Sequence, residues 1–179
     1  ESLTTSARGG LTALHDLVSN QTVTRRSEIV QYLVDAEPSV LRQCDEDGDQ
    51  PLHLACQYDY MSAAIVKILV DCWPESIRLR TSCGMLPIPA LCSSSAMNDA
   101  TTLSILHLLI KMHPESVREV NGNGYLPIYI AARWKSPEFC KVLIDAYPES
   151  LRVEVKGLFP IHWACVGKRT DTAKYLLDL

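Results

Sequence analysis

The stretch "GLFPIHWAC", residues 157–165, is one copy of a nonapeptide that recurs along the chain. The other copies read "GLTALHDLV" at 10–18, "GDQPLHLAC" at 48–56, "GMLPIPALC" at 84–92 and "GYLPIYIAA" at 124–132. Self-similarity at a period of about 20–50 residues is typical of proteins that stack one unit repeatedly. The sequence therefore predicts a single domain over residues 1–179, with repeats at approximately 8–45, 46–81, 82–121, 122–154 and 155–179.

A second apolar block follows each nonapeptide. The blocks lie at 29–34, 65–70, 105–110, 139–144 and 173–177. Their apolar residues recur at i, i+3 and i+4, the spacing of a helix that buries one broad face. A proline follows each of the first four blocks: Pro38, Pro74, Pro114 and Pro148. Because proline lacks the N–H and disfavours helix in the residue before it, we expect each helix to end there.

The segment that joins one repeat to the next has a nearly constant length. The next glycine follows each proline after ten residues, or nine in the last case, whereas the glycine-to-proline distance varies from 24 to 30 residues. We therefore expect the length variation in the link between the two helices of a repeat, where solvent tolerates insertions. An arginine lies four residues after each proline, and we expect it to donate hydrogen bonds to nearby carbonyl oxygens. These arginines are Arg42, Arg78, Arg118 and Arg152.

These motifs resemble the ankyrin repeat family. Its signature G-x-x-P-L-H-x-A is matched at Gly48, Pro51, Leu52, His53 and Ala55, and nearly matched in 157–165. The "LP-[LI]-H" and "PES" segments resemble a divergent ankyrin subtype that is plentiful in algal and other protist genomes. The resemblance covers about residues 8–179. It implies an all-α, ankyrin-type solenoid of about five helix-turn-helix repeats joined by hairpin-like loops.

The resemblance also implies structural roles for the histidines and glycines of the signature. His15, His53 and His162 would bond to the backbone within and between neighbouring repeats, and each glycine would supply the turn of a hairpin. The cysteines at 56, 92 and 165 share one position with Ala132, which favours a small apolar group there. Seven cysteines without a C-x-x-C pair indicate free thiols in an intracellular, reducing compartment, the cytoplasm being favoured over an organelle.

The sequence offers little for catalysis or metal binding. No G-x-S-x-G, H-E-x-x-H or P-loop pattern occurs, and the acidic cluster at 45–49 lacks the glutamate that closes a calcium-binding loop. We therefore expect no catalytic residue, no cofactor and no metal. A net charge of −4 without a basic run disfavours nucleic acid as a partner. The apolar stretch 103–110 is too short to span a bilayer.

Function is therefore expected to depend on the surface. A stack of repeats presents an elongated concave face, which favours a non-catalytic module or scaffold that binds another protein. Two alternatives remain. The chain could be the ankyrin segment of a larger protein whose enzymatic or effector domain lies outside this sequence, or a structural subunit of a large assembly. Because the sequence stops in the second helix of the last repeat, we expect the natural chain to continue or this end to pack against something else.

The family binds its partners mostly through hairpin tips and the exposed ends of the first helices. By position, the hairpin candidates are Glu46, Asp47, Asp49, Met85, Tyr125, Lys156 and Leu158, and the helix-end candidates are Tyr58, Arg133 and Trp134. Tyr, Trp and Arg are over-represented among interface hot spots, although partial burial between repeats is an equal alternative for them. Acidic residues on the second repeat and cations toward the C-terminus, including Arg133, Lys135 and Lys156, predict a charge gradient that orients a partner.

Overall fold

The computed structural model describes residues 12–19, 25–58, 62–94 and 99–179, so the first nonapeptide, which begins at Gly10, is described only from residue 12. Within these ranges the chain forms ten α-helices, four short 3-10 helices and no strand. The α-helices are α1 (Ala13–Ser19), α2 (Arg26–Ala36), α3 (Pro51–Gln57), α4 (Ala63–Cys72), α5 (Pro87–Ser93), α6 (Asp99–Met112), α7 (Pro127–Trp134), α8 (Pro137–Ala146), α9 (Pro160–Val166) and α10 (Thr170–Leu177). The 3-10 helices are η2 (Pro38–Arg42), η3 (Pro74–Arg78), η4 (Pro114–Arg118) and η5 (Pro148–Arg152).

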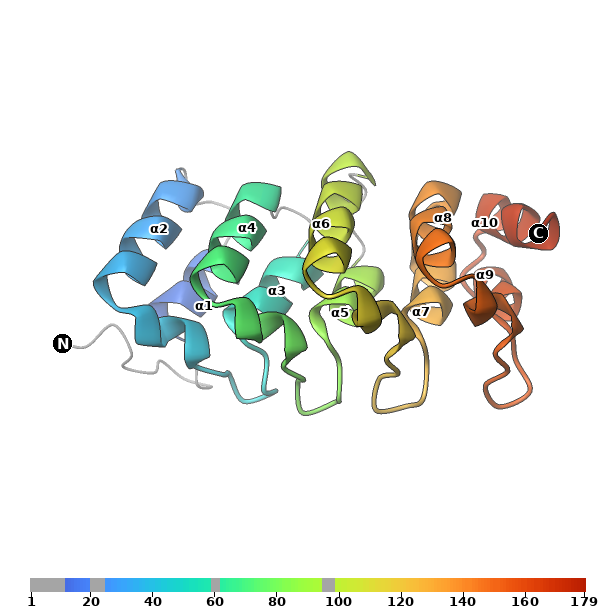
Figure 1. Cartoon of the computed structure of the whole chain (residues 1–179), viewed down its shortest axis with the longest axis horizontal. Helices are drawn as coiled ribbons and strands as arrows, with labels where there is room; N and C mark the ends of the chain where they lie inside the picture. The colour runs from blue at the N-terminus through green and yellow to red at the C-terminus, as the bar shows by residue number, and fades with distance from the viewer. Residues whose placement is uncertain (1–11, 20–24, 59–61, 95–98) are drawn as a thin grey trace.

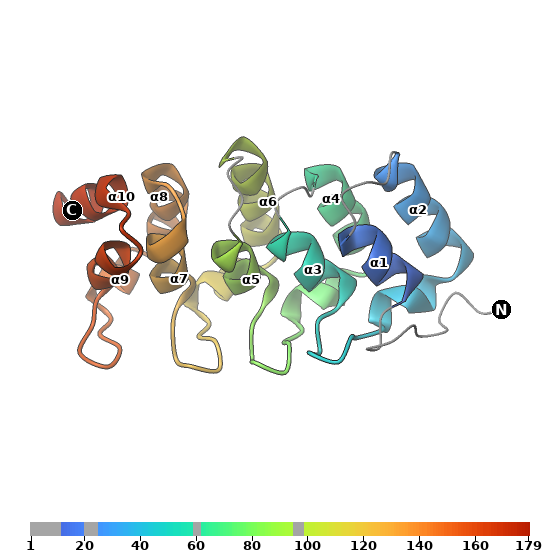
Figure 2. The same cartoon turned by 180° about the vertical axis from the view of Figure 1, so that it is seen from behind.

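The helices stack in two layers. One layer contains α1, α3, α5, α7 and α9, each packed against the next (Figure 2). The other contains α2, α4, α6, α8 and α10 (Figure 1). The loops between successive repeats project along one edge of the stack, below the helices in Figure 1. We call the side formed by the first layer and these hairpins the inner face. This arrangement confirms the predicted all-α solenoid.

Prolines explain both ends of the helices. Four inner helices begin at a proline, where the missing N–H is one that a helix leaves unpaired in any case. The outer helices α2, α4, α6 and α8 end two residues before a proline, as the sequence predicts. That proline then opens a 3-10 helix of five residues, which ends at the repeated arginine.

The variation in repeat length has two different origins. The fourth repeat is short because α8 begins three residues after α7 ends, which agrees with variation in the link. The third repeat is long for another reason: α6 begins six residues after α5 ends, as α4 does after α3, but α6 has 14 residues and α4 has ten. The expectation of an insertion in the link is therefore wrong for this repeat. An added helical turn is tolerated because it pairs its own backbone groups.

The core runs between the two layers as one continuous seam. Leu14 lies at one end and Leu176 at the other, and Leu106 and Leu109 of α6 are fully buried near the middle. The joining segments also contact the neighbouring repeat through their arginines. The Cζ atoms of Arg42 and Arg118 lie 5.8 and 4.8 Å from the ring centroids of Trp73 and Tyr147. Two of the four arginines thus make cation–π contacts where we expected hydrogen bonds to carbonyl oxygens.

Buried histidines hold the repeats in register. Nδ1 of His53 accepts a hydrogen bond from the Gln50 N–H (3.3 Å). Its Nε2 lies 3.1 Å from the carbonyl oxygen of Leu79, in the segment that joins this repeat to the next. The ring of His15 reaches the second repeat, where its Nε2 lies 3.2 Å from the Asp49 carbonyl oxygen. Burial lowers the pKa of both rings. The backbone-linking role is therefore confirmed for these two histidines.

The residue at this histidine position, and its contacts, differ in the later repeats. Tyr129 takes the place of histidine in the fourth repeat, and its hydroxyl donates to the Val153 carbonyl oxygen. His162 in the last repeat is exposed, and its Nδ1 accepts a hydrogen bond from the Phe159 N–H (2.9 Å). The structure therefore gives His162 a contact within its own repeat only, among the residues described.

The last hairpin differs from the others. Val155 and Leu158 exchange backbone hydrogen bonds of 3.0 and 3.1 Å, so the chain turns within two residues. The two residues of the turn, Lys156 and Gly157, have positive φ values of +54° and +77°. Two positive φ values are characteristic of the type I′ turn, which favours Asn, Asp or Gly at the first position. A lysine at the first position of such a turn is strained.

Candidate protein-binding surface

Four of the predicted binding residues are linked to Trp163 of the last repeat by a series of ring contacts. Tyr125 precedes α7, Arg133 and Trp134 end it, and Lys156 lies in the following hairpin. Tyr125 and Arg133 contact the Trp163 ring of α9, while Trp134 contacts Arg133 and Lys156 contacts Tyr125. We call these five residues the aromatic–cationic stripe.

The contacts within the stripe are specific. The rings of Tyr125 and Trp163 meet edge to face with centroids 4.9 Å apart. The Arg133 guanidinium carbon lies 4.9 Å from the Trp134 ring centroid and 5.6 Å from that of Trp163. The Lys156 Nζ lies 5.4 Å from the Tyr125 ring centroid. Each cation is therefore held against an aromatic face, an attractive arrangement that limits its freedom before any partner binds.

Close packing of α7 and α9 places the stripe. A Cβ atom at Gly167, at the end of α9, would lie 2.1 Å from the Arg133 carbonyl oxygen. No side chain can occupy that space, so glycine permits the backbone of the fifth repeat to approach Arg133. The equivalent position in the fourth repeat carries the large side chain of Trp134, which is 46% exposed.

The stripe carries polar groups that the chain itself does not use. The ion pairs among the described residues include neither Arg133 nor Lys156. Arg133 Nε and Trp163 Nε1 are buried, and neither finds a hydrogen-bond acceptor in the described part of the chain. A buried donor without an acceptor costs free energy, and the side chains that cover these two nitrogens keep a partner's acceptor away from them.

The remaining predicted residues lie in earlier repeats or beside the stripe. Glu46 and Asp47 are exposed in the hairpin before α3, and Met85 is half-buried in the hairpin before α5. Tyr58, at the end of α3, is 37% exposed. Leu158 is half-buried, and its carbonyl oxygen lies 3.5 Å from the Tyr129 hydroxyl. Thus only the C-terminal candidates form a cluster.

Two residues of this region are not evident from the sequence. Trp163 occupies a position filled by Leu54, Ala90 and Ile130 in α3, α5 and α7, so an aromatic ring where these three helices have an aliphatic residue is the one signal available. Lys135 was expected to add to the surface charge. It is instead 1% exposed, with its Nζ donating to the carbonyl and hydroxyl oxygens of Ser94 at 2.8 and 2.7 Å. Lys135 therefore joins the fourth repeat to the third and does not extend the charge gradient.

Asp49 lies deeper than its hairpin position suggests. It is 9% exposed, and its Oδ1 has no hydrogen-bond partner among the residues described. Burial, together with the charges of Asp45 and Asp47, raises the pKa of Asp49 to about 6 from an ordinary value of 3.8. Its ionised form is consequently disfavoured in the folded protein.

We expect Asp49→Asn to stabilise the protein at neutral pH. The folded state binds this proton more tightly than the unfolded state, so stability falls as pH rises from about 4 to 6 and the loss is complete above that range. The neutral amide avoids the loss, which is up to about 3 kcal/mol for a shift of this size. Urea unfolding of both proteins checks this. The variant should have a higher free energy of unfolding than the wild type at pH 7.5, and most of that difference should disappear at pH 4.5. An equal difference at both pH values would contradict the assignment.

The cysteines divide into buried and exposed thiols. All seven cysteines are free. Cys56, Cys92 and Cys140 are fully buried, and burial raises the pKa of the Cys56 and Cys140 thiols to about 12. Cys165 takes the same repeat position as Cys56 and Cys92 but is exposed. Within the described ranges, no three metal-ligating side chains come together, and no helix is long and apolar enough to cross a membrane.

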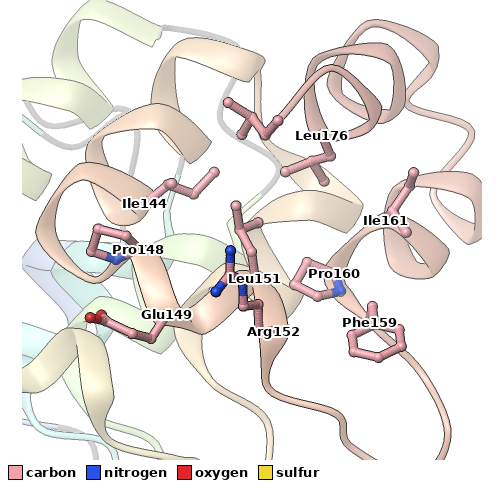
Figure 3. Close-up of a pocket in the computed structure, with 10 residues that line it drawn as sticks. Ile144, Pro148, Glu149, Leu151, Arg152, Phe159, Pro160, Ile161 and Leu176 are labelled. Carbon is pink, nitrogen blue, oxygen red and sulfur yellow. The ribbon is translucent and has the colours of Figure 1, made fainter.

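A hollow of about 580 Å³ lies between the last two repeats. Figure 3 shows Leu151 and Arg152 of η5 between Ile144 of α8 and the start of α9, with Leu176 of α10 beside them. Most of the lining is aliphatic, and the charged side chains are Glu149 and Arg152. The hollow therefore offers an apolar side chain a place to dock.

Comparisons with known proteins agree with this architecture. The profile of a family described as ankyrin repeats, in three copies, matches residues 2–81 and 93–179. Human neurogenic locus notch homolog protein 1 is 26% identical over 139 residues, and human notch homolog protein 2 is 25% identical over 172 residues. These alignments cover 78% and 96% of this chain but 5% and 7% of the relatives. The chain thus spans less than a tenth of the curated relatives it matches.

A solved structure gives the same picture of the fold. One chain of the complex of a predatory endopeptidase from Bdellovibrio bacteriovorus with an immunity protein superposes with a TM-score of 0.73. The match covers 99% of this chain and 85% of that chain, at 19% sequence identity. At this identity the likeness supports the solenoid fold alone.

Proposed function

This chain belongs to the ankyrin repeat family, and from that membership we propose that it is a non-catalytic module that binds another protein through its inner face, the concave face expected of such a stack. Ankyrin repeats are generally protein–protein interaction modules. The proposal includes the binding role of Glu46, Asp47, Asp49, Tyr58, Met85, Tyr125, Arg133, Trp134, Lys156 and Leu158. It also includes a reducing, intracellular location, which the seven free thiols favour.

The observation that carries the proposal is the aromatic–cationic stripe. Trp, Tyr and Arg are the residues most enriched among binding hot spots, and here they are held in fixed contact on one face. Rigid aromatic anchors lose little conformational freedom on binding, so more of the contact energy is available to the complex. The acidic hairpin at Glu46 and Asp47 lies toward the opposite end of the same face, which supports an oriented partner.

We expect the double change Tyr58→Ala and Trp134→Ala to reduce partner capture from a native extract by about tenfold or more, because both exposed rings on the inner face are removed. The matched control is Tyr32→Ala, which removes a ring that is 71% exposed on the outer helix α2. Capture is quantified by mass spectrometry with equal amounts of each folded protein, and urea unfolding establishes equal stability.

Two results would contradict the proposal. In one, the same proteins are captured equally by the wild type and the double variant. In the other, Tyr32→Ala abolishes capture as strongly as the double change, which would place binding on the outer layer.

A further inference from the structure

The unused donors of the stripe indicate the chemistry of the partner. Arg133 Nε and Trp163 Nε1 are both hydrogen-bond donors, and both are buried without an acceptor in the described residues. Neither group can accept a hydrogen bond in its place, since a guanidinium and an indole N–H only donate. A group that meets the accessible part of the Arg133 guanidinium must likewise be an acceptor, and a charged acceptor gives the stronger bond.

The guanidinium is held ready to meet such a group. Arg133 lies between the rings of Trp134 and Trp163, with its Cζ 4.9 and 5.6 Å from their centroids. Stacking of this kind fixes the guanidinium plane, and a fixed plane suits the two oxygens of a carboxylate. Because Nε is buried, the terminal nitrogens of the guanidinium are the donors of Arg133 that a partner's carboxylate can reach.

A strained residue places the second cation on the same surface. Lys156 has φ +54°, and its Nζ lies 5.4 Å from the ring of Tyr125, which in turn meets Trp163. Backbone strain of this kind gathers at binding sites because the surrounding structure maintains it. Two cations, at Lys156 and Arg133, thus flank the Tyr125 and Trp163 rings without an intramolecular carboxylate partner among the described ion pairs.

We propose that the aromatic–cationic stripe binds an acidic segment of a partner protein, in which one Asp or Glu carboxylate accepts hydrogen bonds from the terminal nitrogens of the Arg133 guanidinium and a second acidic residue meets Lys156. Apolar side chains between the two carboxylates contact the Tyr125 and Trp163 rings. This inference rests on the proposed function and specifies the partner's chemistry.

An acidic peptide fits these features better than a nucleic acid does. Nucleic-acid binding depends on many phosphate contacts and is opposed by a chain of net charge −4. The stripe offers two cations at defined positions, which suits two carboxylates on a short segment. The planar guanidinium of Arg133 also favours a planar carboxylate.

The test uses a dye-labelled peptide of four Asp-Leu-Gly units and measures fluorescence anisotropy against the full chain. Matched probes replace every Asp by Asn or by Lys, and a dye-labelled oligothymidylate represents nucleic acid. We expect the Asp peptide to bind about tenfold or more tightly than the Asn peptide and to weaken as salt is raised. The Lys peptide should not bind.

Variants of the chain separate the individual groups. Arg133→Lys keeps the charge but removes the planar guanidinium, so it should weaken the Asp peptide about three- to tenfold and leave the Asn peptide unchanged. Lys156→Gln should weaken the Asp peptide similarly. Trp163→Phe keeps a ring but removes a buried N–H that the peptide does not reach, so it should leave binding of the Asp peptide unchanged. Lys141→Gln, on the outer helix α8, changes the net charge by the same amount and should have no effect.

Three outcomes would overturn the inference. Equal binding of the Asp and Asn peptides would exclude carboxylate recognition while leaving protein binding by the inner face intact. Absence of binding by the Asp peptide would also exclude carboxylate recognition. It would leave the proposed function intact, because capture from extract with the Tyr58 and Trp134 variants tests that function independently. Tighter binding of oligothymidylate than of the Asp peptide, lost in Arg133→Lys, would assign the stripe to nucleic acid and contradict both proposals.

Discussion

Replacing Phe139 by alanine is expected to lower the free energy of unfolding by about 3–5 kcal/mol, the usual cost of removing a buried aromatic ring. Phe139 is fully buried in the first turn of α8, where the Ser136 hydroxyl oxygen accepts a hydrogen bond from its N–H. The buried Lys135 Nζ lies 5.6 Å from its ring centroid. The substitution therefore leaves a cavity beside the buried ammonium group of Lys135 and removes the ring that this group contacts.

The chain supplies its own control, because it contains only two phenylalanines. Phe159 is half-buried at the edge of the hollow in Figure 3, and its ring stacks on His162 at a centroid distance of 6.1 Å. Phe159→Ala is expected to cost about 1 kcal/mol, since much of the ring is already in water. Urea unfolding followed by circular dichroism compares the two variants, and losses of equal size would refute the described burial of α8.

Replacing Gly84 by alanine is expected to cost about 2–4 kcal/mol, the second largest effect. Two terms add here. Gly84 has φ +73°, where an alanine is strained by about 1–2 kcal/mol. In addition, a Cβ atom would lie 2.9 Å from the backbone nitrogen of Gly122 in the next hairpin. That nitrogen donates to the Cys83 carbonyl oxygen (3.1 Å), so the methyl group would also push apart two bonded hairpins.

Gly124→Ala separates these two terms. Gly124 has φ +82°, yet a Cβ atom there would meet nothing within 4 Å. Its expected cost is the backbone strain alone, about 1–2 kcal/mol. Thermal and urea unfolding of the two variants measure the difference. If Gly124→Ala were as damaging as Gly84→Ala, the stacking of neighbouring hairpins would not contribute to stability.

The helices could be predicted because local chemistry decides them. Pro51 and Pro74 act through a missing N–H and a fixed φ, and these effects do not depend on distant residues. The apolar spacing of blocks such as 65–70 likewise identifies the buried face of a helix wherever it packs. The extra turn of α6 was assigned to the link because spacing alone does not say whether added residues continue a helix.

The candidate site was predictable only in part. Tyr125, Arg133, Trp134 and Lys156 follow from their repeat positions, whereas Trp163 lies outside the hairpin and helix-end positions and yet contacts two of them. Lys135 and Trp134 are neighbours in sequence, and one is buried while the other is exposed. Such differences depend on which side chain the adjacent repeat covers.

The sequence by itself determined the repeated unit, the ends of its helices and the two-layer stack, because these depend on interactions within one repeat and on a pattern common to all of them. Only the tertiary structure decided which side chains lie between repeats. The approach of α9 to α7 at Gly167, the enclosure of Lys135 and the meeting of Arg133 with Trp163 all join residues from different repeats. Their geometry depends on the distance between two packed backbones, a quantity that no single repeat contains.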